Sequence, residues 1–245
     1  MIFDRETFFD SVRTSLFGGA MAQPQVDGME AILAAWEHYL EPLGWDRRWL
    51  SYALATTYHE TAQEMQPIEE YGKGAGQPYG EVNEETGQTY YGRGFVQLTW
   101  RDNYVRADRE LEFSGDESLE WHADNALKPD VAARVMFRGM SQAWFRPPND
   151  FERYFNATTE DAYGAREIIN GDKHIVPEWS DGVSIGNLIK GYYTKFLTAV
   201  NESVREELAS EEKEELASEE KVVEIQITIR ITARGPVTIE VVPNA

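Results

Sequence analysis

The stretch YYGRGFVQLTW, residues Tyr90–Trp100, combines four aromatic side chains, two closely spaced glycines, an amide and a hydroxyl within eleven residues. Aromatic rings beside hydrogen-bonding groups are typical of a groove that binds a polar, ring-shaped ligand. About thirty residues earlier, His59-Glu60-Thr61 follows an apolar, helix-like run that begins near Leu50. We therefore expect a helical domain in which an acidic side chain at a helix end faces a binding groove.

The composition is that of a folded protein. The 245 residues are 42% hydrophobic and 12% aromatic, which is sufficient to bury a core. The chain contains no cysteine, which excludes disulfide bonds, a thiol nucleophile and thiolate metal ligands. Its four histidines show no zinc spacing and no HExxH motif occurs, so neither a metal ion nor another cofactor is expected.

The charge and the apolar pattern exclude further classes of partner. A net charge of −20 argues against nucleic acid, which selects basic surfaces. No segment approaches the roughly 18 uncharged apolar residues of a membrane-spanning helix, so membrane insertion is not expected. Residues 1–17 carry five charged side chains and no continuous apolar run, so no secretory signal peptide is predicted.

Hydrophobic periodicity predicts one mainly helical domain over residues 1–200. Apolar residues recur at helical spacing in six segments, at about 3–16, 23–39, 46–60, 131–144, 161–169 and 185–200. Asp46 is the predicted N-cap of the third segment. Between Glu69 and Gly94 the periodicity is lost and seven glycines occur. This composition predicts a loop region beside the groove, where functional residues often lie.

The composition changes near the C-terminus. Residues 206–213 read EELASEEK and residues 214–221 repeat these letters, so residues 201–221 are predicted to form an acidic helical spacer. Residues 222–245 alternate isoleucine or valine with polar residues around Arg234-Gly235-Pro236, which predicts a β-hairpin. An isolated hairpin is marginally stable in water. Its apolar row is therefore expected to dock on the domain or on copies of itself in a homo-oligomer.

Two carboxyl groups are normally needed to hydrolyse a glycosidic bond, one as a general acid and one as a base or nucleophile. Glu60 suits the acid role, because it is expected to emerge from a buried helix into a cleft. In such surroundings desolvation favours the neutral form of a carboxyl group. The second carboxylate is expected on the following loops, where the candidates are Glu69, Glu70, Glu81, Glu84 and Glu85.

The motifs His59-Glu60-Thr61, Tyr90–Trp100 and Asn103-Tyr104 together resemble glycoside hydrolase family 19, which contains chitinases and many phage endolysins. Asn125–Ala133 and Ile168–Gly171 resemble two later segments of that family. The resemblance covers roughly residues 45–200. It implies a lysozyme-like, bilobal helical domain with the glycine-rich loops beside the cleft.

The resemblance implies that Glu60 is the general acid that protonates the leaving oxygen, and that Glu69 is the second carboxylate. Glu69 lies nine residues after Glu60, the spacing of the phage-endolysin branch, and Glu70 is its first substitute. In the plant chitinase branch the second carboxylate lies further along, in a segment that has no clear counterpart here.

The resemblance also implies which other side chains contact the water and the sugar. Thr99 is expected to help hold the attacking water, in a single displacement that inverts the anomeric configuration. The side chains expected to bind substrate are His59, Tyr91, Gln97, Asn103 and Asn170. His59 is equally consistent with a hydrogen-bonded core histidine. An arginine that the family carries near the start of its last helix is not evident, since Ile189 and Lys190 occupy that region.

These features favour an endolysin-type glycoside hydrolase that cleaves the N-acetylmuramic acid–N-acetylglucosamine linkage of bacterial peptidoglycan. The absence of cysteine and of a recognisable signal peptide, with the nine-residue spacing, favours peptidoglycan over chitin. Chitinase activity is the alternative. Such a lysin would remain in the host bacterial cytoplasm until a separate protein released it to the cell wall. A different class of function, a glycan-binding or particle-associated structural protein, would use the groove without catalysis.

The hairpin hypothesis leads to a test of oligomeric state. If residues 222–245 assemble copies of the chain by burying their apolar row, deleting them lowers the particle mass to that of a monomer. Multi-angle light scattering measures that mass directly. A full-length chain that is already monomeric contradicts self-assembly.

Overall fold

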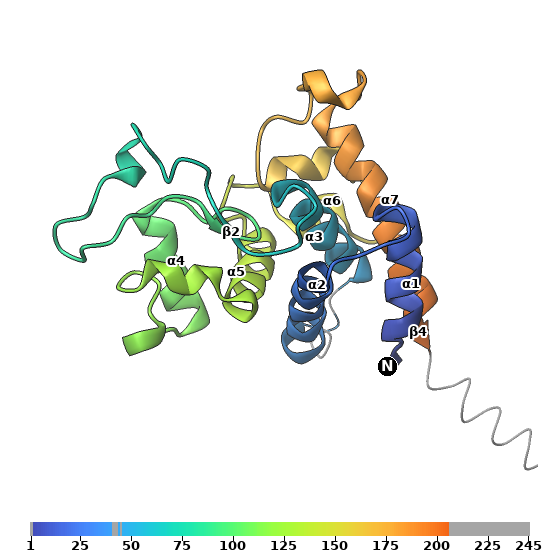
Figure 1. Ribbon diagram of the computed structural model, residues 1–245, viewed down its shortest axis with the longest axis horizontal. Coiled ribbons are helices and arrows are strands. Elements are labelled where there is room, and N and C mark those ends of the chain that lie inside the picture. The colour runs from blue at the N-terminus through green and yellow to red at the C-terminus, as the bar shows by residue number, and fades with distance from the viewer. Residues whose placement is uncertain (1, 41–43, 45, 206–245) are drawn as a thin grey trace, which may run out of the picture. The chain divides into compact units, whose positions relative to one another are not determined.

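The computed structural model describes residues 2–40, 44 and 46–205 (Figure 1). Two compact units are present: Arg5–Glu202, and a second unit of which residues 2–4 and 203–205 are described. In the second unit, β1 (Ile2–Phe3) pairs antiparallel with β4 (Val204–Arg205). Apart from residues 201–205, the predicted spacer and hairpin lie outside the described residues.

The larger unit is mainly helical, as predicted. Its α-helices are α1 (Arg5–Leu16), α2 (Gln23–Ala35), α3 (Arg47–Glu60), α4 (Arg101–Leu111), α5 (Pro129–Ser141), α6 (Phe151–Tyr154) and α7 (Ile185–Ser203). A π-helical turn, Trp36–Leu40, extends α2, and short 3-10 helices form at Pro78–Gly80, Gly115–Glu117, Ala123–Leu127, Gly164–Ile168 and Glu178–Ser180. One short antiparallel pair, β2 (Ile68–Glu69) with β3 (Arg93–Gly94), places Glu69 opposite Arg93.

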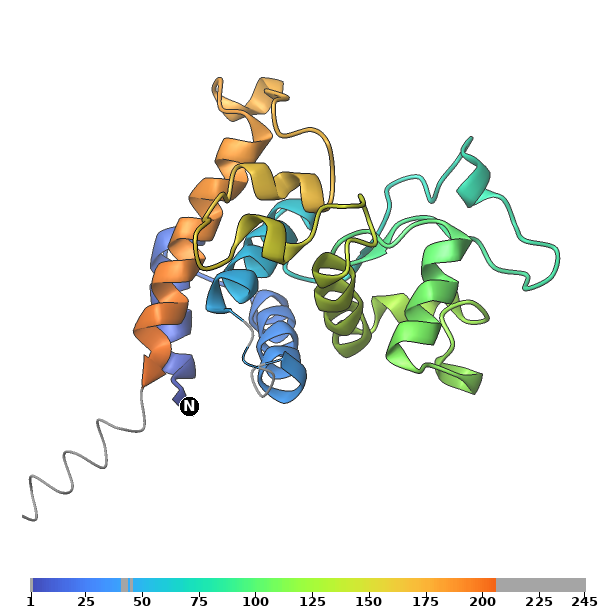
Figure 2. The same cartoon turned by 180° about the vertical axis from the view of Figure 1, so that it is seen from behind.

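Helix α3 is buried along most of its length. Every residue from Leu50 to Tyr58 is buried, so the helix packs on all sides rather than along a single stripe. The Trp49 ring stacks on Phe151 of α6 at a centroid distance of 5.2 Å, and the Tyr58 ring meets Tyr192 of α7 at 4.7 Å. Figures 1 and 2 show α6 and α7 next to α3. The neighbouring elements thereby fix the axis along which Glu60 emerges.

A second apolar cluster surrounds α4 and the first part of α5. Its largest buried members are Tyr90, Tyr104, Phe113 and Trp144. Helix α5 contacts both α2 and α4, so it joins this cluster to the helices around α3. The two clusters match the expected bilobal helical arrangement, and Figure 1 shows α4 and α5 on one side of α3.

Two helices were not predicted from the sequence, α4 and α6. Only Tyr104 and Ala107 of α4 are buried, so its apolar stripe is too narrow to produce a clear helical period. Helix α6 has four residues, hardly more than one turn of 3.6 residues, so its apolar spacing cannot repeat. The predicted helix at 161–169 is instead the 3-10 helix Gly164–Ile168. From Glu69 to Gly94 the chain is mostly loop, as predicted.

Gly28 lies where α2 meets the loop that follows α3. A Cβ atom at this position would lie 1.5 Å from the Met65 carbonyl oxygen. Only glycine therefore permits this close approach of helix and backbone. The contact helps to fix the segment that leads from Glu60 to Glu69.

Substituting Gly28 with alanine is expected to destabilise the protein by about 1–3 kcal/mol, because a helix and a loop must separate to admit the methyl group. Gly191 of α7 is the matched control, since a Cβ there meets nothing within 4 Å. Gly191→Ala is expected to stabilise the protein by about 0.5–1 kcal/mol through its higher helix propensity. Urea unfolding followed by circular dichroism measures both changes, and a neutral Gly28→Ala contradicts the close packing.

Candidate active site

Glu60 is the final residue of α3, and the helix places it beside a buried cation. At the other end of the helix, the Asp46 carboxylate accepts a hydrogen bond from the Arg48 amide at 2.8 Å, as expected for the predicted N-cap. The Glu60 side chain is 18% exposed, and its carboxylate accepts a hydrogen bond from the Arg166 guanidinium. We expected desolvating surroundings for Glu60, and the structure places a charged partner there instead.

Arg166 is shared between Glu60 and Asp172. Its Nε donates to Asp172 Oδ1 at 2.6 Å and its Nη2 to Oδ2 at 2.9 Å, a bidentate pair. Burial acts to lower the Arg166 pKa, but the bonds and charges of both carboxylates outweigh it and raise that pKa. Burial acts to raise the Asp172 pKa, and Arg166 nevertheless holds it below its usual range. The Arg166 guanidinium therefore has two carboxylate partners, Asp172 and Glu60.

His59 precedes Glu60 and is half-buried. Burial lowers the pKa of His59 below its ordinary value; the nearby Arg166 acts in the same direction and Glu60 against it. The imidazole is therefore neutral near pH 7, with one nitrogen available as a donor and the other as an acceptor. A substrate contact for His59 remains a prediction.

Glu69 lies at the end of β2 and both of its carboxylate oxygens are engaged. The Tyr91 hydroxyl donates to Oε1 at 2.5 Å, and the Lys73 ammonium lies 2.9 Å from Oε2. The Tyr91 hydrogen bond and, next, the Lys73 interaction hold the pKa of Glu69 below its usual range. Tyr91, predicted to bind substrate, is buried and directs its hydroxyl at this carboxylate.

The Glu70 side chain is hydrogen-bonded to neighbouring loop residues. Its Oε2 accepts a hydrogen bond from the Gly92 amide at 3.1 Å, and its Oε1 accepts one from the Tyr79 hydroxyl at 3.2 Å. The Glu70 amide also donates to the Gly92 carbonyl at 2.8 Å. These bonds join the segment after β2 to the segments that contain Gly92 and Tyr79, and both Glu70 oxygens are engaged, as those of Glu69 are. The choice of Glu69 over Glu70 as the second carboxylate stays a prediction.

Gln97 and Thr99, between β3 and α4, are hydrogen-bonded in series with Asn103 in the first turn of α4. Gln97 Nε2 donates to the Ile68 carbonyl at 3.1 Å, next to Glu69, and the Thr99 hydroxyl donates to the Gln97 carbonyl at 2.8 Å. Asn103 Nδ2 donates to the Thr99 carbonyl at 2.8 Å. The Thr99 oxygen thus keeps lone pairs that can accept a hydrogen bond from water.

Asn170 is exposed and lies just after the 3-10 helix that carries Arg166. Its amide donates to the Arg166 carbonyl at 3.0 Å, and its Oδ1 accepts a hydrogen bond from the Gly171 amide at 2.8 Å. The Asn170 Nδ2 group is a donor suited to a sugar hydroxyl or acetamido oxygen. The bond from the Asn170 amide to the Arg166 carbonyl links Asn170 to the segment that pairs with Glu60.

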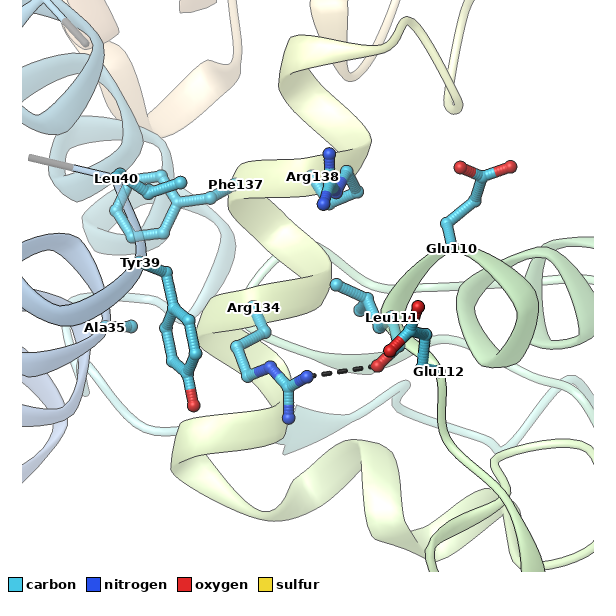
Figure 3. Close-up of a pocket in the computed structure, with 9 residues that line it drawn as sticks. All are labelled: Ala35, Tyr39, Leu40, Glu110, Leu111, Glu112, Arg134, Phe137 and Arg138. Atoms are coloured by element: carbon cyan, nitrogen blue, oxygen red, sulfur yellow. Dashed lines mark hydrogen bonds between the residues drawn. The ribbon is translucent and has the colours of Figure 1, made fainter. Parts of the chain in front are cut away.

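Two hollows differ in their relation to these residues. One of about 530 Å³ is lined by residues 67–73 and Leu127, and so includes Glu69, Glu70 and Lys73. The other, of about 310 Å³, lies between the end of α2, the end of α4 and α5 (Figure 3). In that pocket Arg134 donates to the Leu111 carbonyl at 3.1 Å. Of the candidate site residues, Glu69 lines the first hollow and none lines the second.

Three charged residues of the site were not selected from the sequence: Arg166, Asp172 and Lys73. Arg166 stands two residues before the Ile168–Gly171 motif and ahead of α7, not in the last-helix region where an arginine was sought. One arginine among 23 lysine and arginine residues carries no sign of burial. Its apolar neighbours Ala162, Ala165 and Ile168 were the available signal, since all three are buried with it.

Comparisons with known proteins give similarities only among solved structures. No family model and no curated protein matches the sequence. Chitinase C from Streptomyces griseus is 19% identical, with a TM-score of 0.49 over 82% of this chain and 76% of that chain. A bacterial family 19 chitinase is 20% identical, with a TM-score of 0.43 over 82% and 95%. A class IV family 19 chitinase from Zea mays is 16% identical, with a TM-score of 0.41 over 80% and 94%.

Replacing Asp172 with asparagine is expected to cost about 2–3 kcal/mol of stability near pH 7, because a buried guanidinium loses one of two charged partners. The folded-state pKa of Asp172 is lowered, so its contribution is present above the unfolded-state pKa and is lost as the pH falls through the folded-state value. The gap between wild type and variant therefore narrows below about pH 4.

Urea unfolding at pH 7, 5 and 3 measures this gap. Asp181→Asn is the matched control, because Asp181 is exposed in a left-handed conformation that asparagine tolerates. It is expected to change stability by less than about 0.5 kcal/mol. A gap for Asp172→Asn that stays constant down to pH 3 contradicts the ion-pair interpretation.

Proposed function

We propose that this protein is a glycoside hydrolase that cleaves the N-acetylmuramic acid–N-acetylglucosamine glycan of bacterial peptidoglycan with inversion. The observation that carries the proposal is a pair of carboxylates with different partners. Glu69 is held as an anion by Tyr91 and Lys73. Glu60 shares a guanidinium that Asp172 already neutralises. An acid and a base with separate electrostatic settings are what inverting hydrolysis requires.

The proposed reaction is a single displacement. Glu60 donates its proton to the glycosidic oxygen as the bond from that oxygen to the anomeric carbon breaks. Water forms the new bond to the anomeric carbon and gives a proton to Glu69. Thr99 accepts a hydrogen bond from this water and so helps to orient it. Arg166 remains paired with Asp172 during the cycle, so that loss of the Glu60 proton restores the original ion pair.

The substrate assignment uses the spacing of the two carboxylates. Glu69 follows Glu60 by nine residues, the separation found in the endolysin branch of the family that the motifs resemble. Glu70, the first substitute, accepts hydrogen bonds from the Gly92 amide and the Tyr79 hydroxyl. The proposed place of action is the bacterial cell wall, reached after release from the cytoplasm. No helix within the described ranges is long and apolar enough to cross a membrane.

Chitin is the second candidate substrate, because the same acid and base would cleave a polymer of N-acetylglucosamine. Loss of turbidity of permeabilised bacteria measures the first activity, and release of soluble sugar from colloidal chitin measures the second. Activity on chitin alone would replace the peptidoglycan assignment. A glycan-binding protein without catalysis would show neither activity while retaining affinity for the polymer.

Glu60→Gln and Glu69→Gln are each expected to lower kcat by about 10²–10⁴-fold, because each removes a proton-transfer group. Glu70→Gln is the matched control, since the glutamine carbonyl oxygen can accept the Gly92 bond and its NH2 group can donate to the Tyr79 hydroxyl oxygen. Its kcat is expected to fall less than about fivefold. Proton NMR of the first-formed product reads the anomeric configuration. Equal losses for Glu69 and Glu70, or retention of configuration, overturn the assignment.

A further inference from the structure

The loop after β2 places Lys73 beside Glu69, the last residue of that strand. The Lys73 amide donates to the Glu70 carbonyl at 3.0 Å, and its ammonium lies 2.9 Å from Glu69 Oε2. The Lys73 side chain is 62% exposed. The contact is therefore a charged bond at the edge of the hollow that contains Glu69.

The backbone of this loop is shaped to present Lys73. Lys73 has a φ of 50°, and its neighbours Gly72 and Gly74 have φ values of 86° and 70°. A non-glycine residue in the left-handed region is uncommon and indicates local constraint. A Cβ on Gly74 would lie 2.7 Å from the Gly80 Cα. This close approach fixes the base of the loop, so the glycine run is a support for Lys73 rather than a free linker.

Tyr91, the other partner of Glu69, is held in place by Arg93 and Tyr104. Its ring is covered by the Arg93 guanidinium at 3.7 Å from the centroid, and its carbonyl accepts the Tyr104 hydroxyl at 2.8 Å. Arg93 is itself 3% exposed and donates to the Asp124 carboxylate at 3.1 Å. A cation over an aromatic ring is an attractive contact that holds the ring in place. The Tyr91 hydroxyl therefore has one direction in which to donate, toward Glu69.

We propose that Lys73 and Tyr91 are positioning residues that together hold Glu69 as an oriented anion, ready to take a proton from the attacking water. Tyr91 sets the direction of the carboxylate from the buried side. Lys73 supplies positive charge from the solvent side, on a loop constrained to deliver it. The inference rests on the proposed function for its catalytic meaning, and it also makes a statement about Glu69 that holds without turnover.

The electrostatics support this arrangement. The hydrogen bond from Tyr91 and then the bond from Lys73 are the leading causes that lower the pKa of Glu69. The charge of Arg93 acts on Glu69 in the same direction, and burial acts against it. A base that stays ionised at lower pH extends activity on the acidic side.

The test uses Lys73→Met and Tyr91→Phe in the full chain. Each is expected to move the titration midpoint of the Glu69 carboxyl, followed by carbon-13 NMR, upward by roughly 0.5–1 in pH. The acidic limb of the kcat profile is expected to move by the same amount. The Lys73→Met displacement is expected to shrink as sodium chloride is raised to about 1 M, because exposed charges are screened. Glu69→Gln assigns the NMR signal, and Lys73→Arg is expected to restore the midpoint.

Lys195→Met is the matched control, because Lys195 is an exposed lysine of α7 and its loss changes the net charge equally. It should leave the midpoint and the acidic limb in place. An unmoved Glu69 midpoint in both Lys73→Met and Tyr91→Phe overturns the inference, whatever the activity. A moved midpoint with an unmoved kcat limb also overturns the positioning role. Full activity of Glu69→Gln refutes the proposed function instead, and the NMR midpoints still decide whether Lys73 and Tyr91 control the carboxyl group.

Discussion

The buried guanidinium of Arg166 is the constraint on which the site depends. A charge that is 3% exposed is costly unless it is paired and hydrogen-bonded. Its two partners come from segments far apart in the chain: Glu60 lies 106 residues before it and Asp172 six residues after it. The pairing is satisfied only when the end of α3 and the segment before α7 are together. The Glu60–Arg166 pair therefore forms only in the folded protein.

Glu69, the proposed second carboxylate, is held by a different set of contacts. The β2–β3 pair places Glu69 opposite Arg93, and the turn that follows β3 returns Gln97 to the Ile68 carbonyl beside it. The positively charged partner of Glu69 is Lys73, an exposed side chain. The partner of Glu60 is Arg166, a buried one. The two carboxylates thus have positively charged partners in different surroundings, one buried and one exposed.

The predictions succeeded where the signal was local and failed where it was tertiary. The run that ends at Glu60 was predicted as a helix because Leu50, Ala53, Leu54 and Thr57 recur at helical spacing after a plausible N-cap, Asp46. Helix α4 was missed because only two of its residues are buried. Arg166 was missed for a related reason, since burial of a single arginine produces no periodic pattern in the sequence.

The sequence by itself determined the helical class from its apolar period, and the loop character of residues 69–94 from its glycine content. The order and spacing of the motifs gave Glu60 and Glu69 as the candidate carboxylates. Each of these signals is local and can be read directly from the sequence. The tertiary structure alone decided which groups meet those carboxylates. Arg166 and Asp172 at one, and Tyr91 and Lys73 at the other, are brought close by packing and by left-handed backbone at the loop. Whether a carboxyl group behaves as an acid or as a base depends on these neighbours, since their charges and hydrogen bonds set the balance between its two protonation states.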